Sequence, residues 1–268
     1  MKLSIRGVGF VGAALSDWRE AADALRTGRE PGHMSVAELG RALKADRLPR
    51  TERRRAGKST RLAMTACWEA VEAAGLDPAT LPMVFASSTG DTEVLTHSCA
   101  SLAETDRMIS PIRFHNSVHN AASGYWSISV GAQEPATAIA AHHETAAAGL
   151  LEAGMQATLG DRPVLLVVYD LPFPEPMHQA EPIAEPLAIA LVIQSAQAGD
   201  TDRLAITLSA ETDRGDAGMA GPAWERLRRE VPAGRLLPLL EAMVRREPGR
   251  FPLALDETSY LDLSYQPK

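Results

Sequence analysis

The chain has 268 residues, of which 45% are hydrophobic and 23% are charged, and these ordinary fractions exclude wholesale disorder. Its 27 basic and 34 acidic residues give a net charge of −7, which argues against a general nucleic-acid-binding protein, while two cysteines exclude a disulfide framework and a four-cysteine zinc site. No apolar run is long enough to span a membrane and no secretory signal opens the chain, so we expect a cytoplasmic protein.

The residue pattern in the first part of the chain predicts two strands and two helices. Apolar and polar residues alternate weakly over Leu3–Gly9, and the segment ends with Gly7 and Gly9 on either side of Val8. This pattern predicts a strand that runs into a tight turn. Asp17–Thr27 is typical of a short helix. Ser59–Ala74 gives the strongest helical pattern, because its small apolar residues recur four positions apart. Pro82–Ser88 then predicts a short buried strand.

Several arginines precede the strongest helix. The run consists of Arg50, Arg53, Arg54 and Arg55, with Arg61 just beyond. One interpretation is a solvated loop and the start of a helix. The other is a basic patch on an acidic protein, able to contact a phosphate or an acidic carrier protein.

Helix and strand patterns alternate in the middle of the chain. Apolar periodicity predicts helices over His119–Ala132 and Glu144–Leu159. Apolar runs predict strands over Thr137–Ala141 and Pro163–Tyr169, the second buried on both faces. Strand, helix and strand in this order form a βαβ unit, whose crossover is right-handed.

The C-terminal part begins after a proline-rich stretch, Leu171–Pro186, that predicts an extended loop. Strands are expected over Leu187–Gln194 and Leu204–Ala210. Ala223–Arg246 is expected to be mainly helical, and Tyr260–Tyr265 gives a last strand. Abundant alanine and few aromatic residues suit layered α/β packing.

Four local phrases, in this order, resemble one family. They are Ile5–Gly9, Asp17–Arg29, Ala66–Pro78 and His119–Gly124, the last continued by Ser127 and Ile128. Together they resemble the N-terminal half of a β-ketoacyl synthase of the thiolase fold. The resemblance implies an α/β fold with a five-stranded mixed sheet flanked by helices, lacking most of the second half. It also implies a ketosynthase-like N-terminal domain over residues 1–210 and a short, mainly helical extension with a final strand over residues 211–268.

The sequence departs from this family at the position of the nucleophile. In ketosynthases a strand leads into a cysteine at a helix N-terminus, where the dipole and backbone amides activate the thiol. The matching run here places His143 at that position, between His142 and Glu144. Neither of the two cysteines has the sequence context of a nucleophile. None of the histidines lies in the last 90 residues, the part of the chain in which the family has its catalytic histidines. We therefore expect no catalytic residue of the ketosynthase type.

A ketosynthase-like chain without its nucleophile resembles a chain length factor, as found in aryl polyene and related pigment pathways. The resemblance implies a heterodimer with a full-length β-ketoacyl synthase, contact with an acyl carrier protein, and no cofactor. The strand Pro135–Ala141 would meet the partner. The residues expected at the acyl tunnel or the partner interface are Phe114, Val118, Tyr125, Trp126, Pro135, Thr137 and Ile139.

Two other functions stay open. A hydrolase or decarboxylase could use His143 and Glu144 as a base. A stand-alone module could bind acyl groups or carrier proteins through the same surface. A metal hydrolase is also conceivable, because His115 and His119 are four residues apart and the run His142, His143 and Glu144 supplies further ligands. Their context is that of a loop entering a helix, so we expect no metal site.

Overall fold

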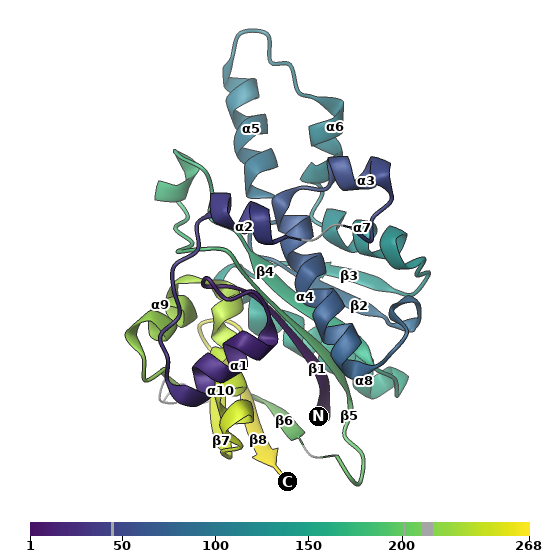
Figure 1. Ribbon diagram of the computed structural model, residues 1–268, viewed down its shortest axis with the longest axis vertical. Helices are drawn as coiled ribbons and strands as arrows, with labels where there is room; N and C mark the ends of the chain where they lie inside the picture. The colour runs from purple at the N-terminus through teal and green to yellow at the C-terminus, as the bar shows by residue number, and fades with distance from the viewer. Residues whose placement is uncertain (44–45, 201, 211–216) are drawn as a thin grey trace.

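The structure is a computed structural model that describes residues 1–43, 46–200, 202–210 and 217–268 (Figure 1). Within these residues it contains one sheet of eight strands. In spatial order the strands are β3 (Ala136–Ile139), β2 (Met83–Ala86), β4 (Val164–Asp170), β5 (Leu187–Ser195), β1 (Lys2–Gly12), β6 (Asp202–Ser209), β8 (Tyr260–Pro267) and β7 (Gly249–Ala254).

The sheet is mixed, as the sequence predicts. β2 runs parallel to both β3 and β4, and the other neighbouring pairs are antiparallel. The βαβ prediction is confirmed, with β2 lying between its two strands. The expected number of five strands is wrong, because β6, β8 and β7 continue the same sheet beyond β1. β7 was not foreseen since it contains Pro252, a residue that a sheet tolerates only at its edge.

Helices cover both faces of the sheet. α4 (Lys58–Ala74) and α7 (Ala121–Val130) share one apolar cluster with Leu165 and Val167 of β4. α8 (Thr145–Gly160) packs on the other face, in a cluster that contains Leu166 and Val168. Every residue of β4 is buried, which confirms the prediction of a strand covered on both sides.

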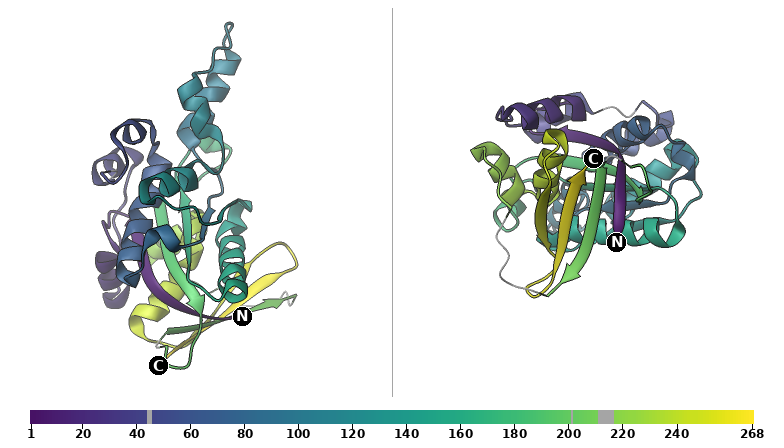
Figure 2. Two further views of the ribbon diagram at one scale, coloured as in Figure 1. Left: turned by 90° about the vertical axis from the view of Figure 1, so that its right-hand side faces the viewer. Right: turned by 90° about the horizontal axis from the view of Figure 1, so that it is seen from below.

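The remaining elements lie around this three-layered centre. α5 and α6 project from the rest of the chain at the top of Figure 1 and in the left view of Figure 2. No helix of the described residues is both long and apolar enough to cross a membrane. The further helices are α1 (Trp18–Thr27), α2 (Val36–Ala42), α3 (Arg50–Arg55), α5 (Thr92–Ala103), α6 (Pro111–Phe114), α9 (Pro222–Glu230) and α10 (Leu237–Arg245). Short 3₁₀ turns are η1 (Pro78–Thr80), η2 (His115–Ser117), η3 (His142–Glu144), η4 (Met177–Gln179) and η5 (Pro232–Leu236).

Two glycines of β1 allow α4 to pack directly on the strand. A Cβ atom at Gly7 would lie 2.1 Å from the carbonyl oxygen of Ala70, and one at Gly9 would lie 1.9 Å from that of Ala66. The expected tight turn at these glycines is wrong, since β1 continues to Gly12. The glycines are required by the close approach of a helix rather than by a turn.

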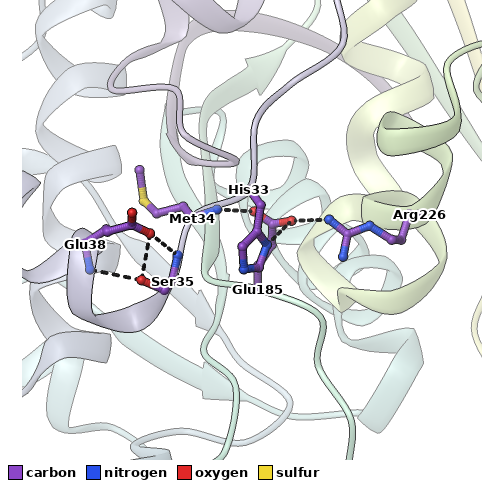
Figure 3. A network of polar contacts seen from close by, with 6 residues as sticks. All are labelled: His33, Met34, Ser35, Glu38, Glu185 and Arg226. Carbon is purple, nitrogen blue, oxygen red and sulfur yellow. Dashed lines mark hydrogen bonds and ion pairs between the residues drawn. The ribbon is translucent and has the colours of Figure 1, made fainter.

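A buried carboxylate joins two distant segments beside the sheet (Figure 3). The side chain of Glu185 has no exposed area. It accepts hydrogen bonds from the Met34 N–H at 3.1 Å and from Arg226 Nη2 at 2.7 Å, and His33 Nδ1 lies 3.4 Å away. Glu185 thereby connects the segment that precedes α2 with α9. Because both donors are paired to one buried acceptor, this network fixes the path of the chain between α1 and α2.

Candidate functional site

The elbow between β3 and α8 is the first candidate site. After β3 the chain passes through η3 and enters α8 at Thr145. Thr145 Oγ1 accepts a hydrogen bond from the Ala141 N–H at 3.0 Å and donates one to the His142 carbonyl at 2.7 Å. His142 has a φ of +50°, a left-handed conformation that is uncommon for a residue with a Cβ atom. The elbow is thus a sharp turn held by one hydroxyl.

The two histidines of the elbow face different surroundings. The His142 side chain is 62% exposed, and its Nε2 lies 3.2 Å from Glu181 Oε2. The rings of His142 and His143 meet edge to face, with their centroids 4.2 Å apart. His143 and Glu144 line a cavity of about 260 Å³, together with Arg228 and Tyr260 among others. A small molecule in this cavity would contact His143 and Glu144.

Neither cysteine lies at the elbow. Cys67 is fully buried in α4, and burial raises the pKa of its thiol. Cys99 is exposed on α5. The prediction that no cysteine occupies the nucleophile position follows from the sequence itself, and the assignment of His143 to that position stays a prediction.

The carboxyl ends of β2, β3 and β4 lie at the same edge of the sheet, because the three strands are parallel. This edge carries an acid that the sequence analysis missed. Asp170 ends β4, is fully buried, and accepts hydrogen bonds from the Ser88 N–H at 2.9 Å and the Ser88 hydroxyl at 2.7 Å. Burial raises the pKa of Asp170 to about 7, although the Ser88 hydrogen bonds favour the carboxylate. A carboxyl group at the end of an apolar strand is the only signal the sequence offered.

A second group of predicted residues surrounds α7. Phe114 and Val118 are 60% and 52% exposed, and with Tyr125 they line a hollow of about 430 Å³. Tyr125 itself is nearly buried, and its hydroxyl donates to Asn116 Oδ1 at 3.0 Å. Trp126 lies apart from this hollow: it is fully buried, with its ring centroid 4.7 Å from that of Trp68 in α4. The structure therefore gathers three of the four predicted tunnel residues and encloses the fourth in the core.

β3 forms one end of the sheet, and Pro135, Thr137 and Ile139 belong to it or adjoin it. The carbonyls of Pro135 and Ile139 accept hydrogen bonds from β2 and from Ser87, the residue after it. Because backbone groups alternate along a strand, those of Ala136 and Ala138 point to the open edge. The role of this edge as a partner interface stays a prediction.

The predicted carrier-docking arginines lie on α3. Arg50 and Arg54 are exposed. Arg53 Nη2 donates to the carbonyls of Asp46 and Leu48, and Arg55 Nη1 lies 3.7 Å from Glu52 Oε1. Two of the four charges are thus engaged within the chain, and carrier docking stays a prediction.

Comparison with known families identifies this architecture. A family model described as "Beta-ketoacyl synthase, N-terminal domain" matches residues 18–247. The chain belongs to this β-ketoacyl synthase family. Among proteins with curated descriptions, none matches the sequence.

Solved structures of the same fold agree with this membership of the ketoacyl synthase family. A chain of a ketosynthase (ApeO) in complex with its chain length factor (ApeC) from Xenorhabdus doucetiae matches with a TM-score of 0.71 and 23% identity, covering 98% of this chain and 99% of that one. A chain of the ishigamide ketosynthase/chain length factor matches with a TM-score of 0.69 and 14% identity, covering 100% and 99%. A chain of AntDE:AntF, a type II carrier protein in complex with its hexaketide-bound ketosynthase, matches with a TM-score of 0.73 and 11% identity, covering 100% of this chain and 99% of that one. The thiolase-like fold is thereby confirmed.

Proposed function

We propose that this chain is a non-catalytic ketosynthase-like subunit, a chain length factor, that pairs with an active β-ketoacyl synthase and limits the length of its product. The observation that carries the proposal is the elbow. It keeps a strand, a strained residue and a helix start, yet it presents His143 instead of a thiol. We expect the pathway to make a polyene or a related fatty-acid-like product.

The chemistry of the elbow supports inactivity. A condensing enzyme must hold its acyl chain as a thioester on a thiolate activated at the helix N-terminus. An acyl group on the imidazole of His143 would hydrolyse readily and could not wait for the second substrate. Cys67 cannot substitute, because burial raises the pKa of its thiol and excludes an acyl carrier.

The surface around α7 and β3 supports a partner. The open edge of β3 offers unpaired backbone groups, which favour pairing with another strand. Exposed apolar side chains border one hollow beside α7, a helix that contacts β3: these are Phe114, Val118 and Ile128. Clustered exposed apolar side chains and an open sheet edge are each typical of a protein interface.

The comparisons support the same class of partner. Two of the similar structures are ketosynthases with chain length factors, and a third is a carrier protein in complex with its ketosynthase. The exposed Arg50 and Arg54 supply positive charge for an acidic carrier protein. On this basis the acyl carrier protein is the second proposed partner.

Co-expression with a ketosynthase from the same gene neighbourhood tests the pairing. The heterodimer is followed by size exclusion with mass measurement, and its Kd is determined by titration. Phe114→Ser should weaken assembly at least about tenfold, since exposed aromatic residues dominate such interfaces. Leu208→Ser is the matched control, because Leu208 is similarly exposed, at 63%, on a strand distant from β3. Equal Kd values for both variants, or no complex at all, would contradict the proposal.

The alternative function is a hydrolase that uses His143 and Glu144, and the cavity that both residues line favours it. A thiol-release assay with acyl-carrier substrates separates the two functions. We expect no turnover by the isolated chain. Turnover that disappears in His143→Ala would establish the hydrolase and exclude the inactive subunit.

A further inference from the structure

The histidines of the elbow meet a carboxylate from a distant loop. His142 Nε2 lies 3.2 Å from Glu181 Oε2, and the ring of His143 crosses that of His142 at 86°. One nitrogen from each imidazole and one oxygen of Glu181 all lie within 4.8 Å of one another. Three donor atoms of the kinds that bind transition metals therefore gather within the space of one ion.

Hydrogen bonds hold the backbone beneath these donors. Thr145 Oγ1 bridges the Ala141 N–H and the His142 carbonyl, and the Glu181 N–H donates to the Met177 carbonyl at 3.2 Å. His142 keeps its φ of +50° in spite of its Cβ atom. A strained residue persists where its surroundings over-determine its conformation. Each loop therefore has its own hydrogen bonds, and the contact between His142 and Glu181 joins the two.

The donor set selects the type of ion. Two imidazole nitrogens and one carboxylate oxygen suit Zn²⁺ and its neighbours in the first transition series, whereas Ca²⁺ and Mg²⁺ prefer oxygen ligands. Ligands about 2.0–2.2 Å from one tetrahedral ion lie about 3.4 Å apart. The pair His142–Glu181 already has this spacing. The third donor belongs to His143, and a change in the orientation of the half-buried His143 ring is what would bring it to the same distance.

We propose that His142, His143 and Glu181 bind one divalent ion of the zinc class, with a fourth position open to water or an exogenous ligand. The proposal is independent of the chain-length function, because an inactive subunit and a hydrolase would both present the same three donors. Without a metal, His142 and Glu181 form a single partly exposed polar contact, which contributes little to stability. A measurement of metal affinity distinguishes a metal site from a polar contact that binds no metal.

The experiment titrates ZnCl₂ into the full-length chain after treatment with a chelator, with calorimetry as the readout. We expect one Zn²⁺ per chain and a melting temperature that rises with Zn²⁺ concentration. His142→Asn and Glu181→Gln should each weaken binding by more than about tenfold, because loss of a ligand costs at least as much as loss of a supporting group. Asn is chosen at position 142 because it tolerates the left-handed backbone.

Two variants serve as matched controls. Glu175→Gln removes an exposed carboxylate from the same loop, and His97→Asn removes a half-buried histidine from α5. Both should bind Zn²⁺ as the natural chain does. With Co²⁺, the natural chain should develop the visible absorption of a tetrahedral site, and His143→Gln should lose it. The proposal is overturned if the natural chain binds Zn²⁺ no more tightly than His142→Asn, or if the controls lose binding equally.

Discussion

Replacement of Trp126 by alanine tests whether this residue is core or tunnel boundary. Trp126 is fully buried and packs on Trp68, whose ring centroid lies 4.0 Å from the guanidinium carbon of Arg47. Truncation of a buried tryptophan removes about 3–5 kcal/mol of stability, because the transfer free energy is lost and a cavity remains. In a chain of this size each kcal/mol lowers Tm by about 2–4 °C. The expected fall in Tm is therefore about 6–20 °C.

Thermal melting followed by circular dichroism measures this change in the isolated chain. Trp126→Phe is the graded comparison, because it keeps most of the ring and removes an indole N–H that has no hydrogen-bond partner among the described residues. We expect it to lower Tm by less than half as much. Leu208→Ala, at an exposed site, should change stability by less than about 0.5 kcal/mol. A fall of less than 2 °C for Trp126→Ala would refute the assignment of Trp126 to the core.

Product length in the complex with a ketosynthase gives the second readout. If α7 also borders the acyl tunnel, Tyr125→Ala opens space beside Phe114 and Val118 and lengthens the polyene, seen as a red-shifted absorbance. Trp126→Ala should then act mainly through stability, because its ring is enclosed by this chain. An unchanged product length for both variants in a folded complex would refute the tunnel boundary on α7.

Two further predictions concern the sheet. Gly9→Ala should lower the free energy of unfolding, measured by urea denaturation, by about 4 kcal/mol or more, because its Cβ would lie 1.9 Å from the Ala66 carbonyl oxygen. Gly124→Ala, where a Cβ meets open space, should leave the free energy of unfolding unchanged. Equal effects of the two variants would contradict the close-packing argument. Burial raises the pKa of Asp170 from 3.8 to about 7, so between these values the folded chain binds the extra proton and stability falls by up to about 4 kcal/mol as pH rises. Asp170→Asn should flatten this slope, and parallel curves for both proteins would exclude the shift.

The sequence predicted the elements whose burial pattern is unambiguous. α4 and β4 could be foreseen because their apolar residues have helical spacing or fill a whole strand, and tertiary contacts reinforce both. The count of strands failed for a different reason. The figure of five came from the family resemblance, whereas strands at the places of β6 and β8 were predicted over Leu204–Ala210 and Tyr260–Tyr265. Only β7 was missed, because it carries Pro252 and its place in the sheet depends on antiparallel pairing with β8.

The candidate site could be predicted only in part. Local order placed His142, His143 and Glu144 at an elbow, because a strand followed directly by a helix leaves a short turn between them. Glu181 could not be foreseen as their neighbour, since it lies in a proline-rich loop whose sequence predicts an extended chain but not where that chain returns. Glu144, which the sequence paired with the histidines, lines the same cavity as His143, whereas His142 contacts Glu181.

On the proposed placement of His143 at the nucleophile position, the elbow keeps its shape without a thiol, because its geometry does not depend on the side chain of residue 143. Thr145 supplies the hydroxyl that joins Ala141 to His142, and α8 approaches β2 so closely that a Cβ atom at Gly149 would lie 2.8 Å from that of Ala86. These contacts belong to the helix and the strand, not to residue 143. A substitution there changes the chemistry at the helix N-terminus and leaves the backbone in place. An inactive subunit can therefore retain the fold that an active partner recognises, while its elbow is free to acquire other ligands.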